Sequence, residues 1–271
     1  MVLPDYHVHT LFSPDSKMEP EEAILAARAS GVTDICFTEH MDLGHHMESF
    51  NRIPDFERIE NSISQLRKKY PEINIGKGIE VGYIPDTAKQ TAAVLSGQTF
   101  DFVLLSAHCV DGIDCYLPES KRDRDKVTAY ERYLETVYDS VMDDNLTECY
   151  DCISHIGYIA KCNHYEDNTF PHQLFPELFD KILREIIKRG KGIEVNTSGI
   201  NRAGHMLPHP SIIRRYHELG GRIITIGSDA HKPQNVGAYI KDAIDIIAEA
   251  GFQEITLFKN REPSFISIKK R

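Results

Sequence analysis

The chain alternates repeatedly between short apolar segments and longer amphipathic ones. The apolar segments have the length of buried strands and fall at residues 5–8, 34–38, 73–79, 100–106, 150–154, 192–196 and 222–228. The helical patterns cover about residues 19–30, 55–69, 86–96, 127–143, 173–189, 210–219 and 235–250. Because strand-helix repeats form parallel sheets with helical crossovers, this alternation predicts an α/β fold that closes, or nearly closes, into a barrel.

The length and charge of the chain agree with one catalytic domain over residues 1–271. A chain of 271 residues can bury one large α/β core, and no linker or internal repeat divides it. No apolar run approaches the ~20 residues that cross a bilayer. The net charge of −10 provides no general basic surface for nucleic acid. We therefore expect a soluble cytoplasmic protein that binds neither membranes nor nucleic acids.

The first strand carries the pair His7 and His9. Side chains alternate faces along a strand, so both imidazoles point the same way and can reach one metal ion. A His-x-His pair standing alone is more often a surface pair or a hydrogen-bonded core pair. The interpretation as a metal site therefore depends on the residues at the ends of the other strands.

Histidines or carboxylates also end five of the other predicted strands. In an α/β barrel the carboxyl ends of the strands converge on one face, so residues distant in sequence meet there. The residues in question are Glu39, His40, Glu80, His108, His155, Asp229 and His231. Together with His7 and His9 they predict a metal centre at that face, with the long connections 40–54, 109–126, 157–171 and 197–209 forming a pocket around it.

Six short motifs in order resemble the polymerase and histidinol phosphatase (PHP) family. They are 5–10 (DYHVHT), 38–40 (TEH), 78–82 (GIEVG), 106–108 (SAH), 154–157 (SHIG) and 227–231 (GSDAH). The resemblance implies a distorted (β/α)7 TIM-like barrel of the PHP type with three divalent metal ions, of zinc, manganese or iron.

The resemblance also implies a ligand set for each ion. One ion takes His7, His9, Glu80 and Asp229, a second takes Glu80, His108 and His155, and Glu80 bridges the two. The third takes Asp15, His40 and His231. Some relatives have histidine at the position of Asp15, and a carboxylate there favours harder cations such as Mn²⁺. Asp15 also lies in an ordinary turn sequence, Ser13-Pro14-Asp15-Ser16.

The activity that the resemblance implies is hydrolysis of L-histidinol phosphate to L-histidinol and phosphate, a step of histidine biosynthesis. Clustered metals lower the pKa of bound water and neutralise the phosphate, so we expect a hydroxide between the first two ions to attack phosphorus. Glu80, Asp229 and His231 are then the catalytic residues. The acid that protonates the leaving alkoxide stays open between His231, Asp15 and a metal-bound water.

Cations in the loops after the strands are candidates for binding the phosphate. Arg202 and Lys161 offer positive charge and His205 lies near Arg202, although solvated surface positions are the alternative for all three. The loop after His108 has polar groups that could bind the aminoalcohol and imidazole of histidinol. The alternative is that they are ordinary surface residues, because acids are common in this chain. These groups are Asp111, Asp114, Tyr116 and Glu119. His45 and His46 are expected in a lid.

Three alternative functions remain open from the residues. A PHP phosphoesterase that acts on another phosphate monoester, such as a nucleotide, could have identical metal ligands. Metal-dependent amidohydrolases also begin with His-x-His but usually bridge their metals with a carboxylated lysine on the fourth strand, where this chain has His108. A noncatalytic PHP module is expected to have degenerate ligands or a larger fused chain, and this sequence shows neither.

Overall fold

Seven parallel strands form the centre of the computed structural model, which describes residues 2–121, 123–162 and 164–268. Their order in the sheet is β1 (Pro4–Val8), β2 (Asp34–Met41), β3 (Asn74–Gly82), β4 (Phe102–Ser106), β7 (Cys152–Ile153), β8 (Gly192–Asn196) and β9 (Ile224–Gly227). A parallel bridge between Val8 and Ala230 joins the first strand to the end of the last. The prediction of a nearly closed (β/α)7 barrel is therefore confirmed.

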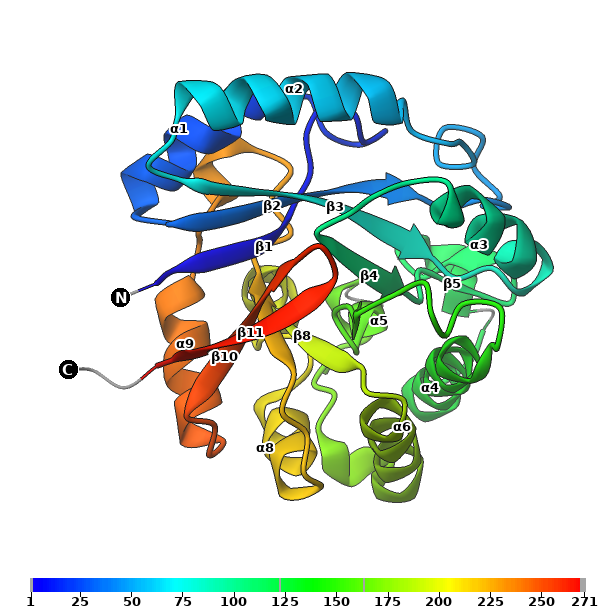
Figure 1. The fold of residues 1–271 in the computed structure, drawn as a ribbon. Coiled ribbons are helices and arrows are strands. Elements are labelled where there is room, and N and C mark those ends of the chain that lie inside the picture. Colours follow the sequence, from blue (N-terminus) through cyan, green and yellow to red (C-terminus); the bar gives the residue numbers. More distant parts are fainter. Residues whose placement is uncertain (1, 122, 163, 269–271) are drawn as a thin grey trace.

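Helices surround the sheet and connect its strands (Figure 1). The outer helices are α1 (Pro20–Ser30), α2 (Phe56–Lys69), α3 (Ala88–Ser96), α4 (Lys126–Met142), α6 (Pro176–Lys188), α8 (Pro210–Glu218) and α9 (Ile240–Glu249). The short helices α5 (Tyr158–Lys161) and α7 (Ile200–Ala203) lie in the connections after β7 and β8. None of the helices within the described ranges combines the length and apolarity needed to cross a membrane.

Local sequence explains where these helices begin and which face they bury. In α6, Pro176 occupies the first turn, where a missing N–H costs nothing, and Phe179, Ile182 and Ile186 form the buried stripe. The sequence pattern predicts that the last helix starts near residue 235, but α9 starts at Ile240. Its start is delayed because Gly237 and Tyr239 have φ values of +74° and +58°, which interrupt a right-handed helix.

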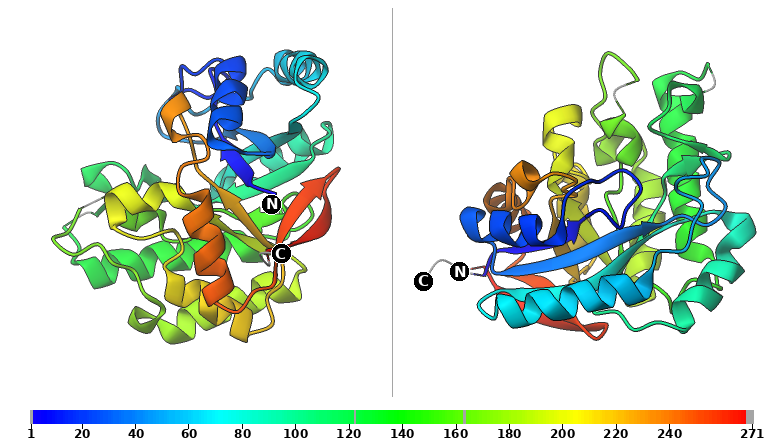
Figure 2. Two further views of the ribbon diagram at one scale, coloured as in Figure 1. Left: turned by 90° about the vertical axis from the view of Figure 1, so that its left-hand side faces the viewer. Right: turned by 90° about the horizontal axis from the view of Figure 1, so that it is seen from above.

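Two antiparallel hairpins, which the sequence did not predict, complete the fold. The larger one, β10 (Glu254–Lys259) and β11 (Glu262–Ser267), lies at the end of the barrel opposite the loops that contain α5 and α7 (Figure 2). The Tyr6 hydroxyl donates to the Phe258 carbonyl at 3.2 Å, and Leu257 and Phe258 pack against the barrel interior. The smaller hairpin, β5 (Cys109–Val110) and β6 (Ile113–Asp114), follows β4. The large hairpin closes the amino end of the barrel and leaves the carboxyl end for the site.

Candidate metal centre

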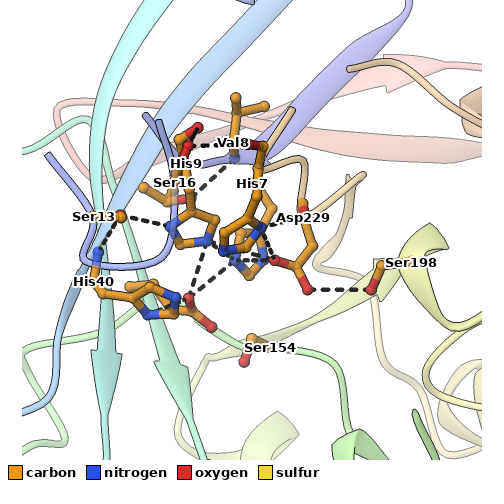
Figure 3. Close-up of polar contacts among 12 residues, drawn as sticks. His7, Val8, His9, Ser13, Ser16, His40, Ser154, Ser198 and Asp229 are labelled. Atoms are coloured by element: carbon orange, nitrogen blue, oxygen red, sulfur yellow. Dashed lines mark hydrogen bonds and ion pairs between the residues drawn. The ribbon is translucent and has the colours of Figure 1, made fainter. Parts of the chain in front are cut away.

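The predicted metal ligands come together at the carboxyl end of the barrel, where the strands deliver them. His7 lies on β1 and His9 directly follows this strand, and their Nε2 atoms lie 3.0 Å apart. Figure 3 shows both rings and the Asp229 carboxylate directed toward a common point, with His40 approaching from the end of β2. The side chains of His7, His9 and His40 are buried, so this cluster is an interior feature of the protein.

Glu80 on β3 lies at the middle of the cluster. Its two carboxylate oxygens are 2.9–3.3 Å from ring nitrogens of five histidines, namely His7, His9, His40, His108 and His155. Burial alone raises the pKa of Glu80, but the surrounding imidazoles lower it well below its ordinary value. The carboxylate is therefore ionised, and it has the central position that a bridging ligand requires.

Asp229 follows β9 and faces the same cluster from the opposite side. Its Oδ1 lies 3.7 Å from Nε2 of His7 and 3.6 Å from Nε2 of His9. Its Oδ2 accepts hydrogen bonds from Lys161 Nζ at 2.5 Å and from the Ser198 hydroxyl at 3.2 Å. One oxygen thus faces the histidines while the other is held by a cation and a hydroxyl group.

Asp15 lies at the solvent side of the cluster. Its Oδ2 is 2.9 Å from Nε2 of His231 and 3.7 Å from Nε2 of His40. The rings of His40 and His231 both stack on His9, with centroids 4.2 and 4.3 Å away. The Asp15 side chain is 37% exposed, whereas the histidine rings are more deeply enclosed. Its position agrees with the predicted third ligand set, at the rim of the cluster.

The Nδ1 atoms of His7 and His108 each contact a carboxylate on the side of the ring that faces away from the centre of the cluster. Glu194 Oε1 accepts from His7 Nδ1 at 2.6 Å, and Asp42 Oδ1 accepts from His108 Nδ1 at 2.8 Å. Because a carboxylate is an acceptor only, each Nδ1 must carry a proton. The Nε2 atom of each ring is therefore the one directed at the centre, which is the orientation typical of metal-binding histidines.

Ser13 gives His9 the same orientation. Its hydroxyl donates to Glu39 Oε2 at 2.6 Å and therefore accepts from His9 Nδ1 at 2.9 Å and from the His40 N–H at 3.0 Å. The sequence alone did not identify Asp42, Glu194 and Ser13 as supporting groups. Glu194 could have been identified from the sequence, because it is a charged residue inside the apolar segment 192–196. A carboxylate is rarely buried in a strand unless a partner binds it.

The geometry of the cluster fits divalent metal ions. The Nε2 atoms of His7 and His9 lie 3.0 Å apart, and Glu80 Oε2 lies 3.2 and 3.3 Å from them, so three potential ligand atoms face one point. Two nitrogens at about 2.0–2.1 Å from a tetrahedral Zn²⁺ lie about 3.3 Å apart. Four buried polar atoms of the cluster lie near oppositely charged or polar neighbours without a hydrogen bond of good geometry: His40 Nδ1, Asp42 Oδ2, Glu80 Oε2 and His231 Nε2.

Four overlapping groups of three residues have ligand atoms within 4.8 Å of one another. They are His9, His40 and His231; His7, His155 and Asp229; His7, His9 and Glu80; and His40, Glu80 and His108. Every predicted ligand except Asp15 occurs in at least one group. The donor set of imidazoles and carboxylates suits zinc, manganese and iron.

A cavity of about 580 Å³ opens over the cluster. Lys161 and Arg202 line it, as predicted for phosphate contacts, and the Arg202 guanidinium lies 4.9 Å from the ring centre of Tyr116. His205 is not among the residues that line this cavity, and its Nδ1 faces the Met206 carbonyl at 2.7 Å. His205 follows Gly204, which has a left-handed conformation (φ +76°) at the end of α7, and its contact with the substrate stays a prediction.

The fold and the buried cluster define an α/β-barrel protein whose strand ends gather histidines and carboxylates in an arrangement that fits divalent metals. Residues 5–198 match the PHP domain, and the chain belongs to the PHP family. A carboxylate, Glu80, lies at the middle of the cluster, in contrast to the carboxylated lysine of the lysine-bridged amidohydrolases.

Individual relatives resemble the chain over nearly its whole length. It is 30% identical over 254 residues to a "probable histidinol-phosphatase" of Clostridium acetobutylicum, which covers 93% of this chain and 95% of that relative. It is 29% identical over 262 residues to the histidinol-phosphatase of Lactococcus lactis, covering 94% of this chain and 93% of the relative. A crystal structure of the histidinol phosphate phosphatase of Lactococcus lactis, in complex with zinc, L-histidinol and phosphate, has a TM-score of 0.85 at 27% identity. That similarity covers 96% of this chain and 98% of the other.

Proposed function

We propose that this protein is a metal-dependent phosphomonoesterase that hydrolyses L-histidinol phosphate to L-histidinol and phosphate. The proposal depends above all on the facing Nε2 atoms of His7 and His9, which lie 3.0 Å apart beside the ionised carboxylate of Glu80. The similarity to histidinol-phosphatases over more than nine tenths of the chain supports the choice of substrate.

Three divalent ions, of zinc, manganese or iron, are proposed to occupy the cluster. We assign His7, His9, Glu80 and Asp229 to the first, and Glu80, His108 and His155 to the second. The third takes Asp15, His40 and His231. Such ions supply a nucleophile at neutral pH, by lowering the pKa of bound water from 15.7 to about 7, and neutralise the charge of the phosphate.

The chain itself contributes the groups that hold and orient the phosphate. Lys161 donates one N–H to Asp229 and has two more for a ligand in the cavity. Burial alone lowers the pKa of Lys161, but the Asp229 carboxylate raises it above its ordinary value, so the amine stays charged. Arg202, with its planar guanidinium, is proposed as the second phosphate contact.

The acid for the leaving alkoxide is proposed to come from the solvent side of the cluster. His231 Nδ1 donates to the Asp229 carbonyl at 2.9 Å, so its Nε2 faces Asp15 and the cavity. As ligands of the third ion, His231 and Asp15 would hold a water molecule at the cavity side, and the acid stays open between that water, Asp15 and His231. Asp229 and Glu80 have the role of holding charge.

We further propose that residues 1–271 act as one catalytic domain in the cytoplasm on a small phosphate monoester, without nucleic-acid or membrane partners. The net charge of −10 supports the exclusion of a general nucleic-acid surface. Salt-dependent retention of the protein by duplex DNA or by anionic vesicles would contradict this part of the proposal.

The test combines metal analysis with phosphate release. The purified protein is expected to contain zinc, manganese or iron, and its kcat/KM for L-histidinol phosphate should exceed that for nucleoside monophosphates and for 4-nitrophenyl phosphate. Chelation should abolish phosphate release, and the divalent ion should restore it. Equal kcat/KM for all three substrates would overturn the assignment of the substrate, and metal-independent turnover would overturn the mechanism.

A further inference from the structure

Asp114 is an acidic residue of the cavity that has no part in the metal-ligand cluster. It lies in the hairpin β5–β6, directly opposite Cys109, and the Cys115 N–H donates to the His108 carbonyl at 2.8 Å. The hairpin therefore brings Asp114 beside a candidate metal ligand. Its carboxylate lines the same cavity as Lys161 but is almost completely buried, with 6% of the residue exposed.

The charge of Asp114 is not neutralised by the groups that contact it. His45 Nδ1 accepts from the Met47 N–H at 3.1 Å, so His45 is a neutral imidazole whose Nε2–H donates to Asp114 Oδ2 at 3.3 Å. Asp114 Oδ1 accepts from the Tyr116 N–H at 2.8 Å. Within the described ranges, no lysine or arginine forms an ion pair with this carboxylate.

The ionised form of Asp114 is nevertheless favoured. Burial alone raises its pKa, but the hydrogen bond from His45, the charge of His108 and the hydrogen bond from Tyr116 lower it below its ordinary value. A buried anion that no cationic side chain pairs is costly unless a ligand supplies the positive charge. The carboxylate is thus suited to a cationic ligand in the cavity.

The other acids of the same loop lack these properties. Asp111 is held by two arginines, Arg124 at 2.7 Å and Arg132 at 3.0 Å. Glu119 is exposed and does not line the cavity. Of the acids predicted as contacts for the aminoalcohol, Asp114 alone lines the cavity wall.

Different loops supply Lys161 and Asp114 to the cavity. Lys161 and Asp229 lie at the end where phosphate is proposed to bind. The Tyr158 ring lies next, 5.0 Å from the His155 ring and 5.1 Å from the His108 ring. Asp114 belongs to the wall formed by the loop after His108, so a phosphate monoester in the cavity can be contacted from both loops.

We propose that Asp114 binds the ammonium group of the substrate's alcohol portion, so that the cavity selects phosphate monoesters whose leaving group carries a positive charge. The inference rests on the proposed function and identifies the residue that distinguishes histidinol phosphate from other monoesters. The amine of an aminoalcohol is charged at pH 7 and forms a charge-assisted hydrogen bond with a carboxylate. Nucleoside monophosphates have no such amine and lose this contact.

The experiment removes either partner of this contact and measures kcat/KM with the metal-loaded protein. Asp114→Asn keeps the shape and removes the charge, and Glu119→Gln is the matched control in the same loop. The substrates are L-histidinol phosphate, 3-(imidazol-4-yl)propyl phosphate, which lacks only the amine, and 4-nitrophenyl phosphate. Calorimetric titration with L-histidinol measures the contact without turnover.

Loss of one charged hydrogen bond predicts a fall of about tenfold to hundredfold in kcat/KM. That fall is expected for Asp114→Asn with L-histidinol phosphate and for the wild type with the analogue lacking the amine. Asp114→Asn should not distinguish these two substrates. Its circular dichroism spectrum and its metal content should equal those of the wild type, which verifies that the variant is folded. If Asp114→Asn does not fold, the wild-type comparison of the two substrates decides the question by itself.

Two outcomes overturn the inference. One is a wild type that does not distinguish the two imidazole substrates, and the other is an Asp114→Asn variant that equals Glu119→Gln on L-histidinol phosphate. Failure of the proposed function gives a different result: no turnover of L-histidinol phosphate by the wild type. In that case L-histidinol binding that depends on Asp114 still supports the cation site, and its absence overturns the site as well.

Discussion

Replacing Glu194 by Gln tests whether the groups behind the cluster control the metal ligands. Glu194 is fully buried on β8, where Oε1 accepts from His7 Nδ1 at 2.6 Å. Oε2 accepts from the His155 N–H at 2.8 Å and from Asn196 Nδ2 at 3.1 Å. All three partners are donors, and Gln offers only one acceptor oxygen. Either orientation of the amide therefore places an NH₂ group against a donor.

The magnitude follows from these contacts. A lost hydrogen bond to a charged group together with a buried unsatisfied donor costs about 2–4 kcal/mol of unfolding free energy. His7 can escape the conflict by moving its proton to Nε2, which removes its lone pair from the metal centre. Loss of such a supporting partner typically weakens metal affinity by about 10–100-fold. Both effects should appear in Glu194→Gln.

The assay measures zinc affinity by competition with a chelator and unfolding by urea, with and without metal. Glu131→Gln, an exposed substitution on α4, is the matched control and should behave as wild type. The reasoning is refuted if Glu194→Gln binds zinc within about twofold of the control. Reduced stability of the metal-free protein with unchanged zinc affinity would assign Glu194 to folding alone.

Three further substitutions have expected outcomes of different kinds. Glu80→Gln should reduce turnover more than about 100-fold in metal-replete buffer, beyond the usual cost of losing a supporting residue, and near-normal kcat would contradict a bridging role. Gly82→Ala places a Cβ 1.7 Å from Asp42 Oδ1. It should cost about 1–3 kcal/mol in urea unfolding and lower metal content, and an unchanged metal content would exclude this coupling. His209 caps α8 by accepting from the Ser211 N–H, and burial together with the nearby His205 lowers its pKa from 6.5 to about 4. Because the folded protein favours the neutral ring, this stability is present above pH 6.5 and is lost as the pH falls toward 4. Between pH 6.5 and 4, His209→Asn should lose about 1 kcal/mol less unfolding free energy than the wild type, after screening by solvent. Urea unfolding at each pH measures this difference, and parallel pH curves for the two proteins would refute the role of His209.

Much of the architecture follows from local sequence patterns. The spacing of apolar residues in segments such as 102–106 and 176–188 identifies strands and helices, because each buries one face or both within a few residues. The alternation then leaves few topologies open, since strand crossovers in a parallel sheet are short and right-handed. For the same reason, the positions of His7, Glu80 and Asp229 at strand ends predicted that they would meet.

Local sequence patterns could not predict the contacts between segments that are distant in the sequence. Asp42 lies two residues after His40 in the sequence, yet its 2.8 Å contact is with His108, because β3 separates their strands and leaves room at Gly82. The exclusion of His205 from the cavity depends equally on a turn at Gly204 that no periodicity reveals. The terminal hairpin pairs residues 254–267 with one another, but it closes the barrel through a contact of Phe258 with Tyr6, far away in sequence.

The sequence by itself determined that this protein is an α/β barrel with histidines and carboxylates at its strand ends, because strand periodicity and strand-end position are local properties. The PHP type followed from the resemblance of its six motifs to that family. Only the tertiary structure decided which nitrogen of each histidine faces the centre, because the deciding acceptors lie on other strands. Glu194 is 187 residues from His7 and becomes its partner only when β1 and β9 close the barrel. The position of Asp114 in the cavity wall was likewise fixed by the hairpin β5–β6, since a carboxylate in a loop acquires a role only from its surroundings.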